Sequence, residues 1–167
     1  MGQLISFENL IAMAPEWRRS GRCVVLASGA FDLLHPGHVR LLEQARSLGD
    51  IVVVALENDP RIRAEAHSPS RSTSSQPAAS RPINPAAERA EILAALAAVD
   101  YVLELGDLTI EDCVLKIRPD VFVQGGFQNQ LHNPAAIEAI GCKILHIPLE
   151  PGFSTATLIR RIQQLPQ

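Results

Sequence analysis

The chain has 167 residues, of which 47% are hydrophobic and 20% charged, so its length suits one domain with a substantial core. A formal net charge of −3 at pH 7 argues against a general binder of nucleic acid, which would normally be basic. No apolar run approaches the roughly 18 residues of a membrane span, and no secretory signal opens the chain. We therefore expect a cytoplasmic protein without membrane or nucleic-acid partners, in which the widely separated Cys23, Cys113 and Cys142 stay reduced.

Helical and strand-like segments alternate along the chain. After a helix expected over about 6–19, short runs rich in Val and Ile predict strands that are buried on both faces. These runs are Cys23–Ser28, Ile51–Leu56, Tyr101–Glu104, Val121–Val123 and Lys143–Ile147. The order predicts an α/β fold over residues 1–167: a single, doubly wound, parallel five-stranded sheet of Rossmann-like type, with helices on both faces.

Residues typical of helix starts stand between these strands. They are Pro36, Asn84 with Pro85, Thr109, Asn133 with Pro134, and Ser154. We expect Asn84 to cap a helix that runs to about Ala98. One segment breaks the pattern: residues 61–80 are rich in Ser, Pro, Ala and Arg without any period, which predicts a mobile surface loop.

The end of the first predicted strand carries the residues that point to chemistry. Doubly wound sheets bind ligands at the carboxyl ends of their strands, and there Gly29 would let the backbone approach a ligand closely. The turn leads to His35-Pro36-Gly37-His38 at a helix start, where free N–H groups favour a phosphate. His35 and His38 are three residues apart, so their rings should share one face and could both donate to a phosphoryl group.

The same pair has other interpretations. A lone H-x-x-H is a weak signal, and either histidine could be an ordinary core residue. A zinc site is less favoured because no third ligand has suitable spacing. A dinucleotide fingerprint, G-x-G-x-x-G, is absent. The position directly after the first strand favours phosphate chemistry.

Gly29-x-Phe31-Asp32-x-x-His35-x-Gly37-His38 resembles the signature of the HxGH cytidylyltransferase-like nucleotidyltransferase superfamily. Further motifs look most like its heptose-1-phosphate adenylyltransferase branch. They are Leu48-Gly49-Asp50, Arg81-Pro82-Ile83-Asn84-Pro85 with Glu88-Arg89, Ile117-Arg118-Pro119-Asp120, Gly125-Gly126 and Ser154-Thr155. The resemblance covers about Val24–Ile162, nearly the whole chain.

The resemblance implies an in-line reaction. A phosphate oxygen of the acceptor, such as a sugar phosphate, attacks the α-phosphorus of a nucleoside triphosphate, and pyrophosphate leaves, with Mg²⁺ as cofactor. AMP transfer from ATP is the version that the branch favours. The resemblance makes His35 and His38 catalytic and assigns the nucleotide to Gly29, Ala30, Phe31, Gly37, Arg89, Gln124, Gly125, Ser154 and Thr155. It places Asp32, Arg63 and Arg81 at the substrate and implies no metal ligand from the protein.

Simpler roles are open for several of these residues. Asp32 could shape its loop, Arg89 could be a solvated cation on a helix, and Arg63 could belong to a solvated loop. Ser154 and Thr155 could only cap their helix, although capping and phosphate binding can coincide. Members of the superfamily often dimerise, so the N-terminal helix around Trp17 is a candidate surface for a homodimer.

The chain also departs from the branch. Where the branch has Lys-Gly-Gly-Asp-Tyr, the sequence reads Gln124-Gly125-Gly126-Phe127-Gln128, so a cation and a carboxylate are missing. The lysine expected after the second strand is missing too. Arg63 lies near its position, with Arg61, Arg71 and Arg81 nearby in sequence, but arginine differs from lysine in shape and reach.

The leading hypothesis is therefore an active adenylyltransferase for a sugar phosphate. Three alternatives stay open: an adenylyltransferase with an altered acceptor, a cytidylyltransferase for a polyol phosphate, and a catalytically impaired nucleotide-binding module.

Overall fold

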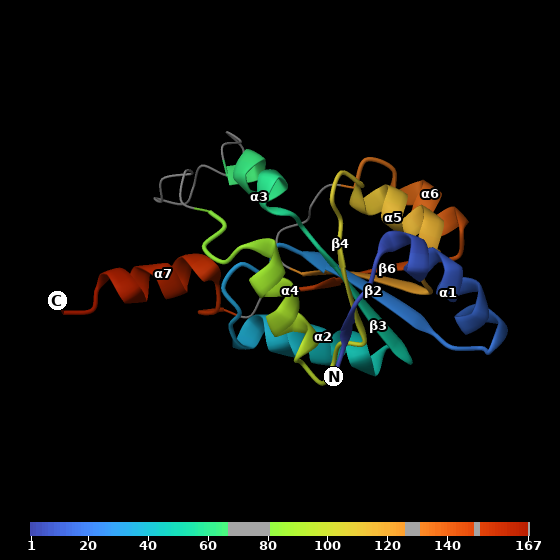
Figure 1. Ribbon diagram of the computed structural model, residues 1–167, viewed down its shortest axis with the longest axis horizontal. Coiled ribbons are helices and arrows are strands. Elements are labelled where there is room, and N and C mark those ends of the chain that lie inside the picture. Colours follow the sequence, from blue (N-terminus) through green and yellow to red (C-terminus); the bar gives the residue numbers. More distant parts are fainter. Residues whose placement is uncertain (67–80, 126–130, 149–150, 167) are drawn as a thin grey trace.

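The computed structural model describes residues 1–66, 81–125, 131–148 and 151–166. Within them, six parallel strands form one sheet in the order β1-β4-β3-β2-β5-β6 (Figure 1). The strands are β1 (Gln3–Leu4), β2 (Val24–Gly29), β3 (Ile51–Leu56), β4 (Tyr101–Glu104), β5 (Val121–Gly125) and β6 (Lys143–Ile147). The helices are α1 (Phe7–Arg19), α2 (Pro36–Ser47), α3 (Asp59–Ala66), α4 (Ala86–Ala94), α5 (Ile110–Ile117), α6 (Pro134–Ala139) and α7 (Thr155–Gln163).

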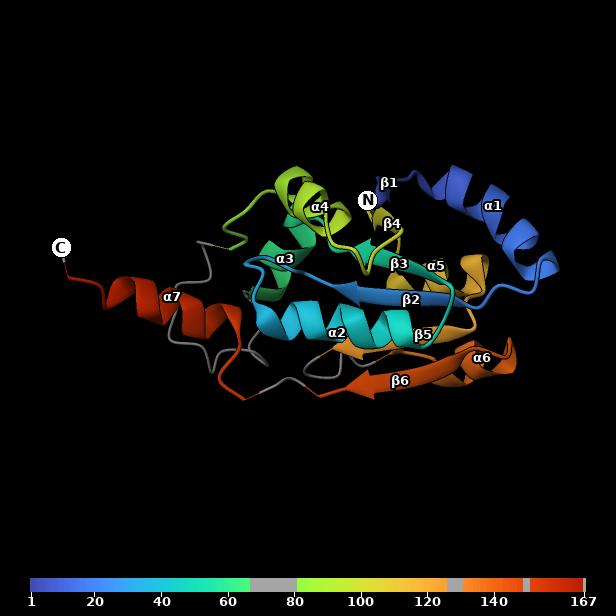
Figure 2. The same cartoon turned by 90° about the horizontal axis from the view of Figure 1, so that it is seen from below.

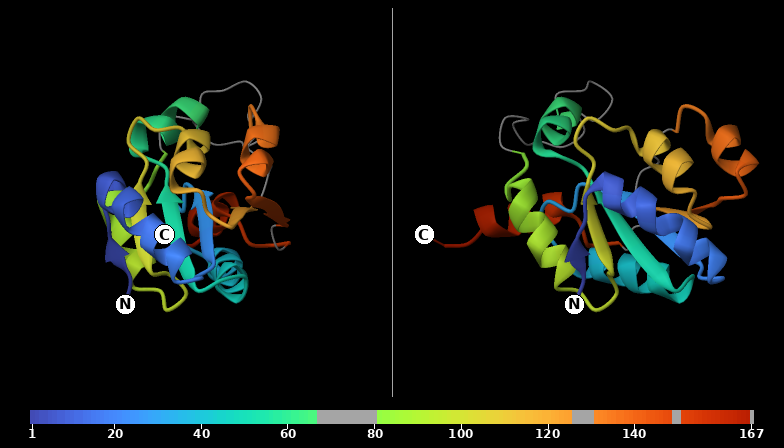
Figure 3. Two further views of the ribbon diagram at one scale, coloured as in Figure 1. Left: turned by 90° about the vertical axis from the view of Figure 1, so that its right-hand side faces the viewer. Right: turned by 45° about the vertical axis from the view of Figure 1, so that its right-hand side comes forward.

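Helices cover both faces of the sheet, as the alternation of elements predicted (Figure 3). Because neighbouring side chains of a strand point to opposite faces, β2 places Val25 and Ala27 against α2 and α4. Its other face places Val24 and Leu26 against α1, α5 and α6. The doubly wound α/β fold is therefore confirmed, and none of the helices in the described residues is long and apolar enough to cross a membrane.

The sheet contains one strand more than the five that the sequence predicts. The extra strand, β1, has two exposed residues and pairs with the start of β4. Backbone hydrogen bonds hold it there, from the N–H of Gln3 to the carbonyl of Asp100 (2.8 Å) and from the N–H of Ile5 to that of Val102 (3.0 Å). A strand made by two backbone contacts leaves no hydrophobic pattern, so the sequence did not reveal it.

Two other segments differ from their predictions. The predicted loop over 61–80 begins inside α3, where the Asn58 side chain accepts a hydrogen bond from the N–H of Arg61 (3.0 Å) and Ile62 is buried. Residues 67–80 lie outside the described residues. Helix α4 ends at Ala94 instead of near Ala98, and Pro85 stands at its N-cap without a side-chain hydrogen bond. The prediction that Asn84 caps this helix is therefore wrong.

Three aspartates accept hydrogen bonds at the amino ends of the central strands. Asp50 and Asp120 accept hydrogen bonds from backbone N–H groups at the start of β2 (2.8 and 2.7 Å), and Asp100 accepts one in β3 (2.7 Å). Cys113 and Cys142 are free and buried, and burial raises the pKa of their thiols to about 12 and about 11. These aspartates and cysteines are engaged in the fold itself, so we look for the ligand site at the carboxyl ends of the strands.

Candidate nucleotide site

The site lies where the order of the strands reverses. Strand β2 is paired with β3 on one side and with β5 on the other, and Ser28 of β2 stands opposite Gln124 of β5. This is the topological switch point, where loops leave neighbouring strands in opposite directions and open a crevice. Gly29 and Gly125 end the two strands at this point.

The loop after β2 is closed by an aromatic ring. Phe31 is buried and has φ of 46°. Residues with a side chain rarely adopt this left-handed conformation, which costs about 1–3 kcal/mol. Its ring packs on that of His38 with centroids 5.1 Å apart. A Cβ at Gly29 would lie 3.1 Å from the same ring, so the space beside Gly29 holds Phe31. This contact gives a packing reason for the glycine, and the close approach of a ligand to Gly29 stays a prediction.

The two histidines form a stacked pair. Their ring centroids are 3.7 Å apart and the planes differ by 14°, which confirms that the rings share one face. His35 is also the N-cap of α2, where its Nδ1 accepts a hydrogen bond from the backbone N–H of His38 (3.3 Å). A Cβ at Gly37 would come within 3.1 Å of the His35 ring and 3.2 Å of the Phe153 side chain, so only glycine leaves this packing undisturbed.

Both imidazoles are neutral near pH 7. Burial lowers the pKa of His38 to about 4, and the adjacent His35 and the charge of Arg81 act in the same direction. Burial lowers the pKa of His35 as well. Among the described residues, nothing bonds to the buried Nδ1 of His38. A neutral ring with an unused nitrogen can donate or accept one further hydrogen bond, and leaving that nitrogen unpaired is costly.

Because the pKa of His38 is lowered in the folded protein, we expect the free energy of unfolding to fall at acid pH. The unfolded chain binds a proton at His38 more readily, with pKa 6.5 against about 4 in the fold. The contribution of neutral His38 to the free energy of unfolding is therefore complete above pH 6.5. It declines as the pH falls below 6.5 and is lost near pH 4, and its size is at most about 3 kcal/mol. Urea unfolding of the wild type and of His38→Asn between pH 7 and pH 4.5 checks this, and the variant should lose less stability. Parallel curves would contradict it.

Asp32 acts as an anchor for the loop. Its carboxylate is 0% exposed and accepts hydrogen bonds from the N–H groups of Ile83 (2.6 Å) and Asn84 (3.1 Å) and from Nε of Arg81 (3.1 Å). The Asn84 side chain donates to the carbonyl of Asp32 in return (3.2 Å). The structure thus favours the loop-shaping role over the substrate contact, and it leaves Arg81 partly exposed, at 34% of its side chain.

Arg89 is a second anchor. Its side chain is 0% exposed and donates from Nε to the carbonyl of Asn84 (3.0 Å), from Nη1 to the carbonyl of Ala30 and from Nη2 to Asp59 (2.7 Å). It is therefore not a solvated cation, and these three partners are all protein groups. Asp59 was missed by the sequence analysis, because its partner lies 30 residues away along the chain.

Two of the other arginines proposed near the phosphates, Arg61 and Arg63, lie on α3. Nη2 of Arg63 is 3.9 Å from Oδ2 of Asp59, and the Arg63 side chain is 58% exposed. Nη2 of Arg61 donates to the carbonyl of Leu108 (2.7 Å), in the loop after β4. Arg71 lies outside the described residues.

The end of β5 contains the first departure from the branch. Gln124 is buried, at 5% exposure, in the strand beside β2. Gly125 is required by packing, since a Cβ there would lie 2.0 Å from Cδ1 of the buried Leu41 in α2. Phe127, the second departure, lies outside the described residues.

Helix α7 begins beside the start of α2. Ser154 caps α7 by accepting from the N–H of Thr157 (3.1 Å), so its predicted capping role is confirmed, and Thr155 is the first helical residue. Phe153 contacts α2 at Gly37 and lies under the guanidinium of Arg40, 5.2 Å from the ring centroid. The N-termini of α2 and α7 are thus brought together (Figure 2). No local pattern in the sequence marks Phe153, because its role depends on this tertiary contact.

Comparisons with known proteins agree with this geometry. A family model described as Cytidylyltransferase-like matches residues 26–133. The Bifunctional protein HldE of Methylobacillus flagellatus is 36% identical over 162 residues, covering 96% of this chain and 31% of that protein. HldE of Gluconobacter oxydans is 33% identical, covering 99% and 33%. The chain therefore spans about a third of the length of these relatives.

Solved structures show the same fold. The lipopolysaccharide core biosynthesis protein from Thermoplasma volcanium has a TM-score of 0.60 at 23% identity, covering 78% of this chain and 98% of that one. Pantoate-beta-alanine ligase from Francisella tularensis has a TM-score of 0.55 at 15% identity, covering 99% and 74%. With a family model that matches most of its length, and with the fold and stacked histidines described above, the chain belongs to the Cytidylyltransferase-like family.

Proposed function

We propose that this domain transfers AMP from ATP to a phosphorylated sugar and releases pyrophosphate. Membership of the family supports nucleotidyl transfer, and the HldE relatives agree with the adenylyltransferase branch indicated by the motifs. The observation that carries the proposal is the stacked, neutral His35/His38 pair, which lies where the N-termini of α2 and α7 meet. Two helix N-termini and two neutral donors suit a triphosphate, because both supply N–H groups to phosphate oxygens.

In this mechanism a phosphate oxygen of the acceptor attacks the α-phosphorus of ATP. The bond from that phosphorus to the bridging oxygen breaks, and pyrophosphate leaves in line. His38 donates a hydrogen bond to the oxygens on which negative charge spreads, and His35 holds the neighbouring ring in place. Stabilisation of this kind is effective because the donors are already oriented before the reaction.

Arg81 supplies the positive charge that Gln124 cannot provide. Its Nε is held by the buried Asp32, which aims the rest of the guanidinium, and its charge lowers the pKa of His38. Arg81 thus lies near enough to act on the ring that meets the phosphates. Arginine is suited to this role because its fork of donors matches phosphate oxygens. A contact of Arg63 with substrate stays a prediction.

Mg²⁺ would be held mainly by the phosphates of the nucleotide. The described residues contain no group of three His, Cys, Asp or Glu side chains that could hold a metal ion, and the Asp32 carboxylate is occupied by Arg81 and two backbone N–H groups. Mg²⁺ commonly binds through substrate phosphates and water with few protein ligands. Bound in this way, the ion would neutralise phosphate charge.

A second candidate function is a nucleotide-binding module without turnover. The observation that favours it is Gln124, a buried amide at the end of β5 where the branch has a lysine. An amide can donate a hydrogen bond but cannot neutralise phosphate charge. Nucleotide binding without pyrophosphate release would identify this function.

Pyrophosphate release separates these candidates. The assay combines ATP or CTP with heptose 1-phosphate, other sugar phosphates and polyol phosphates, while calorimetry measures nucleotide binding. We expect turnover with ATP and a sugar phosphate. Turnover with CTP and a polyol phosphate alone would replace the proposal with a cytidylyltransferase, and binding without any turnover would support the module.

Restoring the missing charges should widen the choice of acceptor. We expect Gln124→Lys combined with Phe127→Asp to raise kcat/KM for heptose 1-phosphate by about 10-fold or more, since a charge-assisted hydrogen bond contributes about 1.5–3 kcal/mol. Gln44→Lys, which adds the same charge at an exposed site on α2, is the control and should change nothing. Equal rates in all three proteins would show that these positions do not select the acceptor.

A further inference from the structure

The backbone N–H of Phe31 has no hydrogen-bond partner in the part of the chain that the structure describes. Phe31 is buried, at 4% exposure, and lies in the loop that leads to the histidine pair. Nearly all backbone donors in buried residues are paired, because an unpaired one is costly. We therefore look for the partner of this N–H among the oxygens of a bound ligand.

The direction of this N–H follows from the bond on the other side of the same peptide unit. The carbonyl of Ala30 and the N–H of Phe31 belong to one planar trans unit, so they point in opposite directions. The carbonyl accepts a hydrogen bond from Nη1 of Arg89 in α4. Figure 2 shows α3 and α4 on one side of the loop after β2, and β5 and β6 on the other. The N–H of Phe31 is therefore turned away from Arg89, toward the side on which β5 ends beside β2.

Arg89 can hold the Ala30 carbonyl only while its own charge is compensated. Its side chain is 0% exposed, and within the described residues it is paired with Asp59, whose Oδ1 lies 2.7 Å from Nη2. A buried guanidinium without a counter-ion is strongly disfavoured, so it would turn toward water if the carboxylate were removed. Asp59 thus acts on the peptide unit between Ala30 and Phe31 through Arg89.

The position of Asp59 is fixed from outside the histidine loop. Asp59 is the first residue of α3, and the preceding Asn58 donates from its side chain to the carbonyl of Gly106 (2.7 Å). The same side chain accepts from the N–H of Arg61 (3.0 Å). Nη2 of Arg61 in turn donates to the carbonyl of Leu108 (2.7 Å). These bonds tie the start of α3 to the loop after β4, so the carboxylate of Asp59 is already in place in the free protein.

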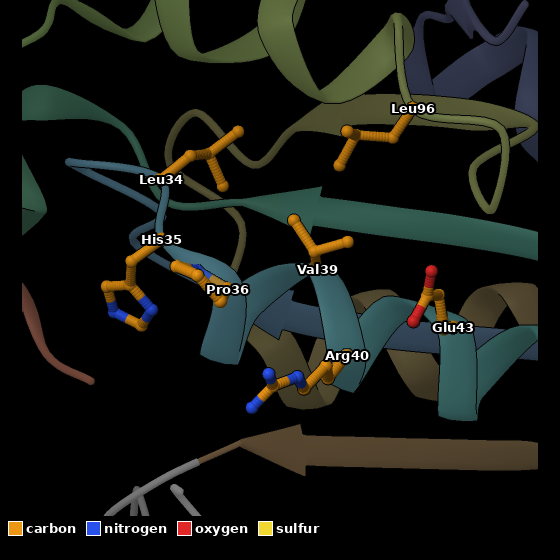
Figure 4. A pocket seen from close by; sticks show the side chains of 7 residues that line it. All are labelled: Leu34, His35, Pro36, Val39, Arg40, Glu43 and Leu96. Atoms are coloured by element: carbon orange, nitrogen blue, oxygen red, sulfur yellow. The ribbon is translucent and has the colours of Figure 1, made fainter. Parts of the chain in front are cut away.

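The histidine end of the loop is held by other contacts. Leu34 packs against the hydrophobic core and points toward Leu96, whereas the ring of His35 points away from both (Figure 4). His35 is also tied to the start of α2 as its N-cap. Loss of Asp59 should therefore disturb the N–H of Phe31 while His35 keeps its place.

We propose that Asp59 is a positioning residue for nucleotidyl transfer. Through Arg89 it keeps the N–H of Phe31 aimed at the phosphate oxygens on which negative charge develops. A donor that is fixed in direction before the reaction stabilises such charge better than one that has to reorient. This inference rests on the proposed function, because it needs a triphosphate in the crevice.

Steady-state pyrophosphate release by Asp59→Ala tests the proposal. We expect kcat to fall by about 10-fold or more and KM for ATP to change by less than about 3-fold, since the two helix N-termini still hold the phosphates. Asp59→Asn keeps an oxygen that can accept from Arg89 and should recover part of kcat. Asp100→Ala is the matched control, because Asp100 pairs with Arg46 (2.5 Å) and accepts a backbone N–H of β3. It lies at the amino ends of the strands, so its loss should leave kcat unchanged.

A double variant separates positioning from stability. Asp59→Ala combined with Arg89→Met removes both charges of the buried pair, so it should resist urea better than Asp59→Ala alone. We expect kcat to stay low in the double variant, because nothing then holds the Ala30 carbonyl. A return of kcat to the wild-type value together with stability would show that Asp59 is only structural, and would overturn the proposal.

Amide NMR signals of ¹⁵N-labelled phenylalanine report the contact itself, and the chain has five phenylalanines to assign. In the wild type, ATP without acceptor should shift the Phe31 signal strongly. In Asp59→Ala this shift should be lost while calorimetry still detects ATP binding. An unchanged Phe31 shift in Asp59→Ala, or ATP binding by the wild type without a Phe31 shift, would overturn the inference alone. A wild type that binds no ATP in the calorimeter would overturn the proposed function and the inference with it.

Discussion

Replacing His38 by alanine is expected to lower the rate of pyrophosphate release by about 10²–10³-fold, the usual cost of losing one preoriented donor to a developing negative charge. The ring is neutral, stacked on His35, packed against Phe31 and has a buried nitrogen without a partner among the described residues. Alanine removes the donor and leaves the cap of α2 in place. The effect should appear in kcat more than in KM, because the donor acts on charge that develops during the reaction.

Two variants make this measurement specific. His38→Gln keeps an N–H donor and should recover part of the lost rate, whereas His38→Leu keeps apolar volume and should not. His35→Ala is a structural comparison, since it removes the N-cap of α2 and should also cost about 1 kcal/mol of stability. If His38→Ala retained the wild-type rate while remaining folded, the histidine pair would have no part in the chemistry.

The second large effect is expected at Arg89. Arg89→Met should lower the free energy of unfolding by about 3–5 kcal/mol, the cost of breaking a buried ion pair by removing one partner. The substitution leaves the carbonyls of Ala30 and Asn84 and the carboxylate of Asp59 without their shared donor. Urea unfolding followed by circular dichroism measures the loss.

Arg63→Met is the matched control. Arg63 approaches the same Asp59 from α3, but 58% of its side chain is exposed, so its removal should cost less than about 1 kcal/mol. A stable Arg89→Met protein with greatly weakened ATP binding would show that Arg89 contacts nucleotide, as the family resemblance implies. Loss of stability with ATP affinity retained in the folded fraction would establish it as a positioning residue.

The parts of this molecule that could be predicted from the sequence are those with local causes. The apolar runs of β2, β3 and β5 predicted the central strands, and the three-residue spacing of His35 and His38 predicted their shared face. What escaped prediction depends on partners far apart in the chain. Strand β1 is held by backbone contacts to β4, and Phe153 meets Gly37 across more than a hundred residues.

The functions of single residues in the motif were harder still. Asp32 and Arg89 belong to the family pattern, yet the pattern does not say whether such a charge contacts ligand or protein. In the structure both side chains are buried and hydrogen-bonded to protein groups, including Ala30, Ile83 and Asn84, which favours an anchoring role. Gly29 illustrates the same limit, because the sequence did not reveal that the Phe31 ring would lie where a Cβ at this position would point.

The placement of these anchors has a consequence for how the protein can diverge. The backbone of residues 30–32 is held by Asp32, Asn84 and Arg89 from the side of α3 and α4, whereas Gln124 belongs to β5 on the opposite side. The histidine loop does not draw these anchors from the end of β5. We therefore expect substitution of Gln124 to leave the shape of residues 30–32 unchanged, so that the two sides of the crevice can be altered separately by mutation.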